Sequence, residues 1–105
     1  MELKKYRWAK TYEAGEGELI DLLENKKIDA ARWIAEEFEH YEPQVDDADT
    51  RIWCAEGSIT YTSPSDGKKI PLQAGDALDI PANLFYEADA GFAGAICYQA
   101  TLIKQ

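Results

Sequence analysis

The sequence predicts a mostly β protein, an antiparallel sandwich or barrel with one short helix near the N-terminus. From position 50 onward, apolar segments typical of about six or seven short strands recur at roughly 8–12-residue spacing. A turn with early proline and late glycine, Pro64–Gly67, separates two of these segments. Ahead of them, Glu16–Lys27 has its leucines at helical spacing.

The N-terminal quarter predicts one strand and one helix. Leu3 to Trp8 can form a first strand with Tyr6 and Trp8 on one face. Acidic residues open the Glu16–Lys27 helix and two lysines close it, as the helix dipole favours. Three leucines share one side of this helix: Leu19, Leu22 and Leu23.

The segment Asp29–Tyr41 fits two structures. Propensity favours a helix, with Asp29 as N-cap and apolar residues on one face. An alternating pattern also fits, with Trp33 and Ala35 opposite Arg32 and Ile34. The family resemblance described below favours two short strands with a break near Glu36, and this is our prediction.

The second half predicts strands throughout. Glycines separate several of the predicted strands: Gly57 lies between Thr50–Ala55 and Ser58–Ser63, and Gly75 precedes Ala77–Pro81. Gly91 and Gly94 precede Ala95–Leu102. The predicted segments are Thr50–Ala55, Ser58–Ser63, Lys68–Gln73, Ala77–Pro81, Leu84–Ala88 and Ala95–Leu102.

Length and charge limit the function classes. The 105 residues predict one domain spanning 1–105, and the net charge of −9 makes nucleic acid an unfavourable partner. No apolar run approaches the roughly 18 residues that span a membrane. Since Met1–Lys5 lacks the apolar core of a signal peptide, we expect a cytoplasmic protein. Buried, reduced thiols are expected at Cys54 and Cys97, with a disulfide between neighbouring strands as the alternative.

One motif is more specific than the rest. Gly75–Tyr86 has a Gly-Asp turn, a short apolar strand, a Pro-x-Asn turn and a second strand containing Tyr86. Asn83 tolerates the left-handed conformation that this second turn needs. The spacing resembles the second cupin motif: glycine, five residues, proline, one residue, glycine, two residues, histidine. Asparagine replaces the second glycine, and Tyr86 stands where that family has a metal-binding histidine.

Glu56-Gly57 resembles the end of the first cupin motif, and the resemblance covers about residues 28–100, with a strand and a helix in 1–27. It implies an antiparallel cupin β-barrel, also called a double-stranded β-helix or jelly roll. Counting back along the motif places four residues at the usual metal-ligand positions: Gln44, Asp46, Thr50 and Tyr86.

These residues argue against a transition-metal site. The family's usual ligands are three histidines and a glutamate, and this chain has one histidine in total, His40. The four replacements offer neither imidazole nor thiolate, which hold transition metals tightly. We therefore predict no metal and no cofactor, although one carboxylate with neutral oxygen donors can hold a hard cation weakly.

Other candidates have structural alternatives. The acidic run Asp46–Asp49 fails the EF-hand pattern, since Arg51 and Gly57 stand at its sixth and twelfth positions; a solvated connection is expected. His40 is a general base or, more simply, a surface histidine beside acidic neighbours. Trp33, Trp53 and Tyr61 line a pocket or pack in the core or at a dimer face.

Two functional hypotheses follow. The first is a metal-independent barrel that binds a small polar molecule through Gln44, Asp46, Thr50 and Tyr86. The second is an enzyme: either a metal-free isomerase or epimerase, with Tyr86 and His40 or Asp46 as acid and base, or a weak divalent-metal enzyme with oxygen ligands. The resemblance also implies a homodimer, with Tyr6 and Trp8 as a plausible contact.

Overall fold

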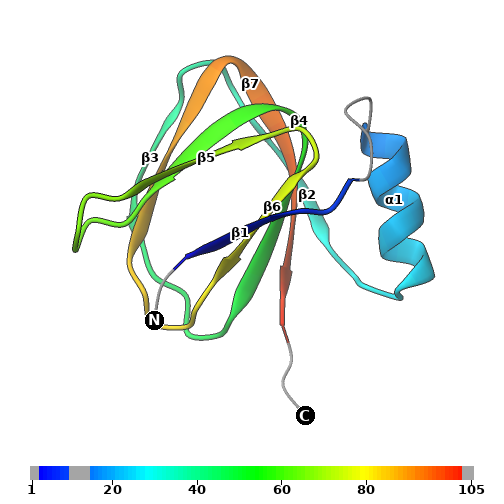
Figure 1. Cartoon of the computed structure of the whole chain (residues 1–105), viewed down its shortest axis with the longest axis horizontal. Helices are drawn as coiled ribbons and strands as arrows, with labels where there is room; N and C mark the ends of the chain where they lie inside the picture. Colours follow the sequence, from blue (N-terminus) through cyan, green and yellow to red (C-terminus); the bar gives the residue numbers. More distant parts are fainter. Residues whose placement is uncertain (1–2, 10–14, 103–105) are drawn as a thin grey trace.

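The computed structural model describes residues 3–9 and 15–102, and within these ranges it contains seven strands and one helix (Figure 1). All strand pairs are antiparallel and belong to one sheet. The helix α1 lies outside the curved sheet (Figure 1). In chain order the elements are β1 (Lys4–Arg7), α1 (Glu16–Asn25), β2 (Ala31–Ala35), β3 (His40–Gln44), β4 (Thr50–Thr62), β5 (Lys69–Gln73), β6 (Asp76–Ile80) and β7 (Tyr86–Thr101).

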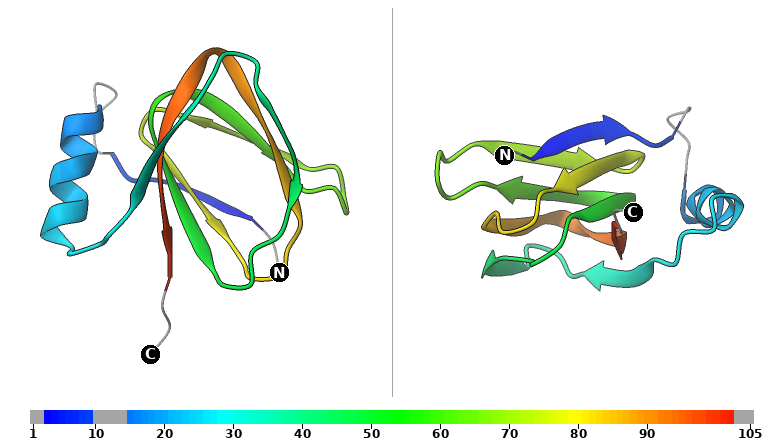
Figure 2. Two further views of the ribbon diagram at one scale, coloured as in Figure 1. Left: turned by 180° about the vertical axis from the view of Figure 1, so that it is seen from behind. Right: turned by 90° about the horizontal axis from the view of Figure 1, so that it is seen from below.

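A long ribbon of β4 and β7 organises the barrel. These strands pair from Thr50 opposite Thr101 to Thr62 opposite Glu87, with register shifts near Gly57. The first part of β4 pairs with β6, and β6 pairs in turn with β1. The second part of β4 pairs with β5. Similarly, β7 pairs with β3 and then with β2. Because bulges increase local bending, the ribbon curls and its flanking strands enclose an interior (Figure 2).

The predicted breaks within β4 and β7 are wrong. We expected separate strands on either side of Gly57 and of the Gly91–Gly94 region, whereas each pair forms one continuous strand. Gly57 and Gly94 have positive φ angles of 76° and 70° and sit where the ribbon bends. The glycines therefore mark a bend inside a strand, as isolated strand glycines often do.

Other element predictions are confirmed. The helix forms at Glu16–Asn25 with Leu19 and Leu23 buried. The ambiguous segment forms the two strands β2 and β3, and the intervening turn contains Phe38 at a φ of 57°. Asn83 adopts the left-handed conformation, with a φ of 66°.

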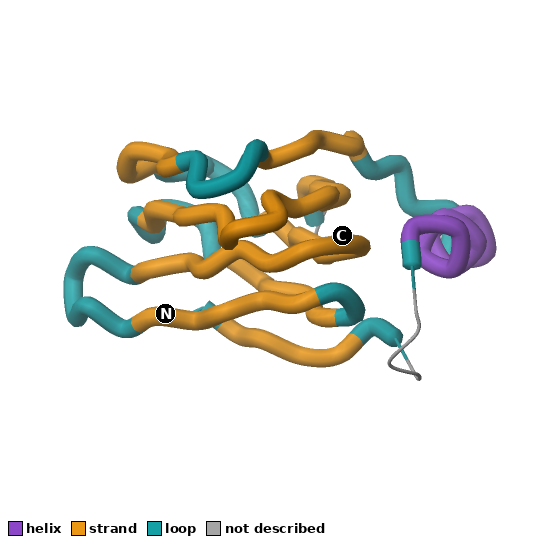
Figure 3. The backbone as a smooth tube through the Cα atoms, turned by 90° about the horizontal axis from the view of Figure 1, so that it is seen from above, coloured by secondary structure: helices purple, strands orange, loops and turns teal. Residues whose placement is uncertain are grey.

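The buried side chains form two clusters on opposite faces of the sheet. The interior cluster lies on the inner face of the barrel and includes both cysteines, which face each other across β4 and β7 as free thiols. The outer cluster packs α1 against β4 and β7 and is centred on Leu19, Trp53 and Tyr98. Figure 3 shows α1 beside one end of the strands. Trp53 thus belongs to the core and not to a pocket.

The aromatic residues near the N-terminus have different surroundings. Trp8 is buried and donates its indole N–H to the Cys54 carbonyl at 3.0 Å. Tyr6 is 37% exposed, with the Arg51 guanidinium 5.3 Å from its ring centroid. Trp8 is therefore buried within its own chain and is not a dimer contact. The homodimer itself stays a prediction. Within the described residues, no helix is long and apolar enough to cross a membrane.

Candidate functional site

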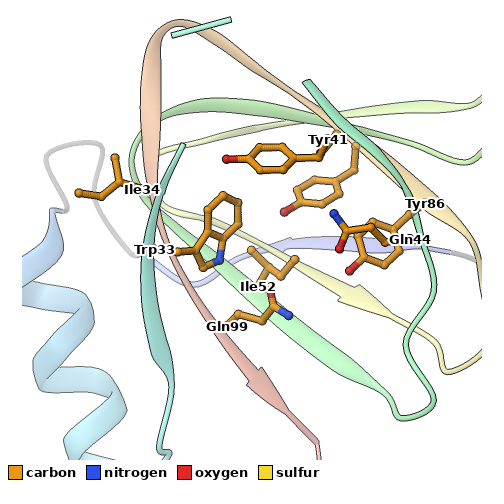
Figure 4. A pocket seen from close by; sticks show the side chains of 9 residues that line it. Trp33, Ile34, Tyr41, Gln44, Ile52, Tyr86 and Gln99 are labelled. Carbon is orange, nitrogen blue, oxygen red and sulfur yellow. The ribbon is translucent and has the colours of Figure 1, made fainter. Parts of the chain in front are cut away.

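A cavity of about 340 Å³ opens into the barrel between β2, β3, β4 and β7. Its wall contains four aromatic rings, two glutamine amides and three aliphatic side chains (Figure 4). The lining residues are Trp33, Ile34, Tyr41, Gln44, Ile52, Tyr61, Tyr86, Ala88 and Gln99. The volume lies within the range of small-molecule sites, which are typically lined by apolar groups with a few polar ones.

The aromatic rings form two contacting pairs. Trp33 and Tyr41 meet edge to face, with centroids 5.7 Å apart and planes 77° apart. Tyr61 and Tyr86 are tilted by 47° with centroids 5.9 Å apart. Such offset or perpendicular arrangements are the favourable ones for aromatic pairs. The wall is therefore packed before any ligand binds, which lowers the ordering cost of binding.

Two of the phenols are hydrogen-bonded to carboxylates. Tyr86 donates to Asp46 Oδ2 at 3.0 Å, and Tyr41 donates to Glu39 Oε1 at 2.9 Å. Burial, reinforced by the Asp46 bond, raises the pKa of Tyr86 far above its usual value. Burial and then the Glu39 bond raise the pKa of Tyr41 to about 12. Both phenols are protonated at neutral pH and are weak acids.

The acidic run after β3 is tied to the turn after β6. The backbone N–H of Asn83 donates to the backbone carbonyl of Asp46 at 2.7 Å, and the backbone N–H of Ala82 donates to Asp49 Oδ1 at 2.8 Å. Asp47 is exposed, whereas Asp46 and Asp49 are partly buried. The prediction of a merely solvated connection is therefore wrong for Asp46 and Asp49, which fix the two loops together.

The four residues at the predicted ligand positions gather at one end of the barrel. Gln44 on β3 pairs with Tyr86 on β7, and both line the cavity. Asp46 Oδ2 accepts from Tyr86 and, at 3.4 Å, from Thr50 Oγ1. Asp46 and Thr50 do not line the cavity. Only two of the four therefore face the space where a ligand would bind.

The donor set at this place is all oxygen and amide. Among the described residues, no group of three or more His, Cys, Asp and Glu side chains is arranged to hold a metal ion. Asp46 is the single carboxylate among the four candidates, and it already accepts from two hydroxyls. These donors do not match the nitrogen and sulfur ligands that transition metals prefer.

His40 does not join Tyr86. Its Nδ1 lies 2.6 Å from Asp89 Oδ1 and its Nε2 lies 4.0 Å from Glu42 Oε1. The next residue, Tyr41, faces the cavity, so strand alternation directs His40 to the outside. The pairing of His40 with Tyr86 as base and acid thus has no geometric support. The Asp89 bond raises the pKa of His40 above its ordinary value.

This ion pair gives a testable pH dependence. Because the folded-state pKa of His40 is raised, the pair stabilises the fold fully below the unfolded pKa near 6.5, and this stabilisation is lost as pH rises through the folded pKa. NMR titration of the chain's single histidine should therefore give a midpoint above 6.5. Asp89→Asn should move the midpoint back down. An unchanged midpoint in that variant would show that Asp89 is not the cause.

Several cavity residues were not predicted from the sequence. Tyr41, Gln99 and Ile52 carry no motif and were not singled out. A signal did exist for Gln99, because it lies two residues after Cys97 along β7 and residues at this spacing face the same side of the sheet. Trp33 and Tyr61 were named as pocket or core candidates, and both line the cavity.

Trp33 also carries an unsatisfied polar atom. Its indole Nε1 is buried and has no hydrogen-bond partner among the described residues. Leaving a buried donor unpaired costs roughly 1–3 kcal/mol, and such groups are rare in native structures. An indole nitrogen can only donate, so this position favours an acceptor in the cavity.

Comparison with solved structures is decisive for the fold. A DUF861 family protein from Thermotoga maritima superposes with a TM-score of 0.67 at 18% identity, covering 96% of this chain and 100% of the other. A cupin superfamily protein from Desulfitobacterium hafniense gives 0.63 at 18% identity, covering 98% and 79%. The fold is a cupin fold.

The cupin barrel also occurs as part of larger neighbours. The ribosomal oxygenase YcfD from Escherichia coli gives a TM-score of 0.61 at 20% identity, covering 74% of this chain and 23% of that protein. No family model matches the sequence, and no curated protein matches it. At these identities the likeness defines the cupin architecture, and function must be argued from the cavity.

Proposed function

We propose that this cupin barrel binds a small polar molecule in its interior without using a metal ion. The observation that carries the proposal is the preformed cavity of about 340 Å³, walled by aromatic rings and bearing polar groups that converge on it. An apolar cavity with a few converging polar groups is the usual form of a small-molecule site. Gln44 and Tyr86 line the site, Asp46 accepts a hydrogen bond from the Tyr86 hydroxyl, and Thr50 donates to Asp46.

A metal-free isomerase or epimerase is the second candidate, and the Tyr86–Asp46 contact of 3.0 Å favours it. In such an enzyme Tyr86 would donate a proton to the substrate as the general acid, and the Asp46 carboxylate would accept a proton from the substrate as the general base. Two features make this the weaker candidate. The phenol already donates its proton to Asp46, and the strongly raised pKa of Tyr86 makes proton release difficult. A divalent-metal enzyme has still less support, since Asp46 supplies the only carboxylate among the four candidate ligands.

Blocking the cavity tests the binding function. Ala88 is buried and lines the cavity, so Ala88→Phe should fill it. Chemical-shift titration against a library of small polar compounds should find binders of the wild type that perturb Ile52 and Ala88, and these should not bind the Phe variant. Ala93→Phe places the same ring at an exposed site on the same strand and should retain binding.

Circular dichroism tests whether the Ala88→Phe variant folds. If this variant does not fold, Ala88→Ile is the smaller replacement. Binders that affect wild type and filled variant equally would place their site elsewhere and contradict the proposal. A library with no compound that perturbs the cavity would contradict it as well.

A further inference from the structure

The inference concerns the chemical class of the ligand and therefore rests on the proposed binding function. Polar groups without partners in the described part of the protein face the cavity from several strands. Besides the buried Trp33 indole N–H on β2, these include the side-chain amides of Gln44 on β3 and Gln99 on β7. Figure 4 shows all three side chains around Ile52. No hydrogen bond joins either amide to another described residue, so all three groups are available to a ligand.

The electric charge of the ligand follows from the lining. No charged side chain among the described residues lines the cavity. Burying an ion without a partner of opposite charge is unfavourable, and the chain's net charge of −9 further disfavours an anion. A cation would find aromatic faces, but it would leave the Trp33 N–H without an acceptor. An uncharged ligand that carries an acceptor satisfies both conditions.

The shape and functional groups follow from the aromatic walls and the amides. A glutamine amide presents a donor beside an acceptor, which complements the N–H and C=O edge of another amide. The rings favour a flat ligand that can stack or meet them edge to face. A monosaccharide carries more hydroxyls than these few groups can pair, and each unpaired buried hydroxyl weakens binding.

We propose that the cavity binds an uncharged, planar cyclic amide. Its ring lies among the aromatic walls, one carbonyl accepts from Trp33 Nε1, and its amide edge pairs with Gln99 or Gln44. The indole N–H then gains the partner that it lacks within the described protein.

Uracil is a suitable probe because it is a neutral ring with two carbonyls and two N–H groups. Calorimetric titration should detect binding to the wild type. We expect 1,3-dimethyluracil, which keeps both carbonyls and loses both N–H donors, to bind about tenfold more weakly, the effect of one lost hydrogen bond. Glucose, choline and benzoate test the polyol, cation and anion alternatives.

Variants identify the contacts. Trp33→Phe keeps an aromatic ring and removes the N–H, and Gln99→Leu keeps the size and removes the amide; each should weaken uracil binding about tenfold. Gln73→Leu is the matched control, since Gln73 is exposed on β5 and does not line the cavity. It should leave uracil binding unchanged.

The outcomes separate this inference from the proposed function. Tighter binding of glucose, choline or benzoate than of uracil would overturn the cyclic-amide class while supporting a binding cavity. The class is likewise overturned if library compounds bind the cavity and uracil does not, or if Trp33→Phe and Gln99→Leu bind uracil as well as Gln73→Leu does. If neither uracil nor any library compound reaches the cavity, the proposed function itself fails.

Discussion

We expect Gly57→Ala to lower the free energy of unfolding by roughly 2–5 kcal/mol, the sum of two costs. Gly57 has a φ of 76°, and an L-residue in that left-handed region costs roughly 1–2 kcal/mol. A Cβ there would also lie 2.9 Å from the Gly94 carbonyl carbon and 3.0 Å from Ala95 Cα. Both neighbours are backbone atoms of β7, so relief requires moving the ribbon, and overpacking of this kind costs roughly 1–3 kcal/mol.

Urea unfolding measures the change, and Gly17→Ala is the matched control. Gly17 lies in α1, and no neighbouring atom would lie within 4 Å of an alanine Cβ at this position, so the substitution should be neutral or stabilise by up to roughly 1 kcal/mol. A Gly57→Ala variant as stable as the Gly17 variant would mean that β4 and β7 separate easily at the bend. The two-strand ribbon would then not be the rigid frame of the barrel.

Much of the fold was predictable because local chemistry and tertiary structure agree. The helix followed from leucine spacing, and the turn at Asn83 followed from the tolerance of asparagine for positive φ. The segment 29–41 was different. Its helical propensity was overridden because β2 and β3 pair with β7 along their lengths, an interaction distant in sequence that propensity does not contain.

The continuity of β4 and β7 was not predictable from local signals. A glycine at positive φ is common in turns between strands, and the same residue also permits a bulge within a strand. Which occurs at Gly57 depends on whether a partner strand continues past it. Here β7 continues opposite residues 59–62 with a shifted register, so the strand persists.

The candidate site was predicted in part. Motif spacing placed Gln44 and Tyr86 together, and the structure pairs them across β3 and β7. The same spacing did not reveal that Asp46 lies outside the cavity lining and accepts from the Tyr86 phenol. Tyr41 and Gln99 were not predicted because they belong to different strands and no motif links them. Their side chains line one cavity only after the sheet closes into a barrel.

The second large effect is expected at Asp46. Asp46→Ala removes the acceptor of the Tyr86 hydroxyl, and Tyr86 is only 5% exposed. The phenol proton is then unpaired in a buried position, which costs roughly 1–3 kcal/mol. Thr50 Oγ1 retains the Ala48 carbonyl as an alternative acceptor at 3.2 Å, so the loss is concentrated on Tyr86. Asp47→Ala, at the exposed neighbouring position, should change stability by less than about 0.5 kcal/mol.

A double-mutant cycle separates the contribution of this hydrogen bond to stability from the contribution of the Asp46 charge. Tyr86→Phe alone should cost less than Asp46→Ala, because the partly buried carboxylate left behind can still be hydrated. The Tyr86→Phe variant has no phenol that could lose its acceptor. Adding Asp46→Ala to it should therefore lower the free energy of unfolding by roughly 1–2 kcal/mol less than it does in the wild type. Urea unfolding of the four proteins gives this coupling energy directly. A coupling near zero would mean that Tyr86 finds another partner when Asp46 is removed, and that the Asp46 hydrogen bond does not hold the phenol in place.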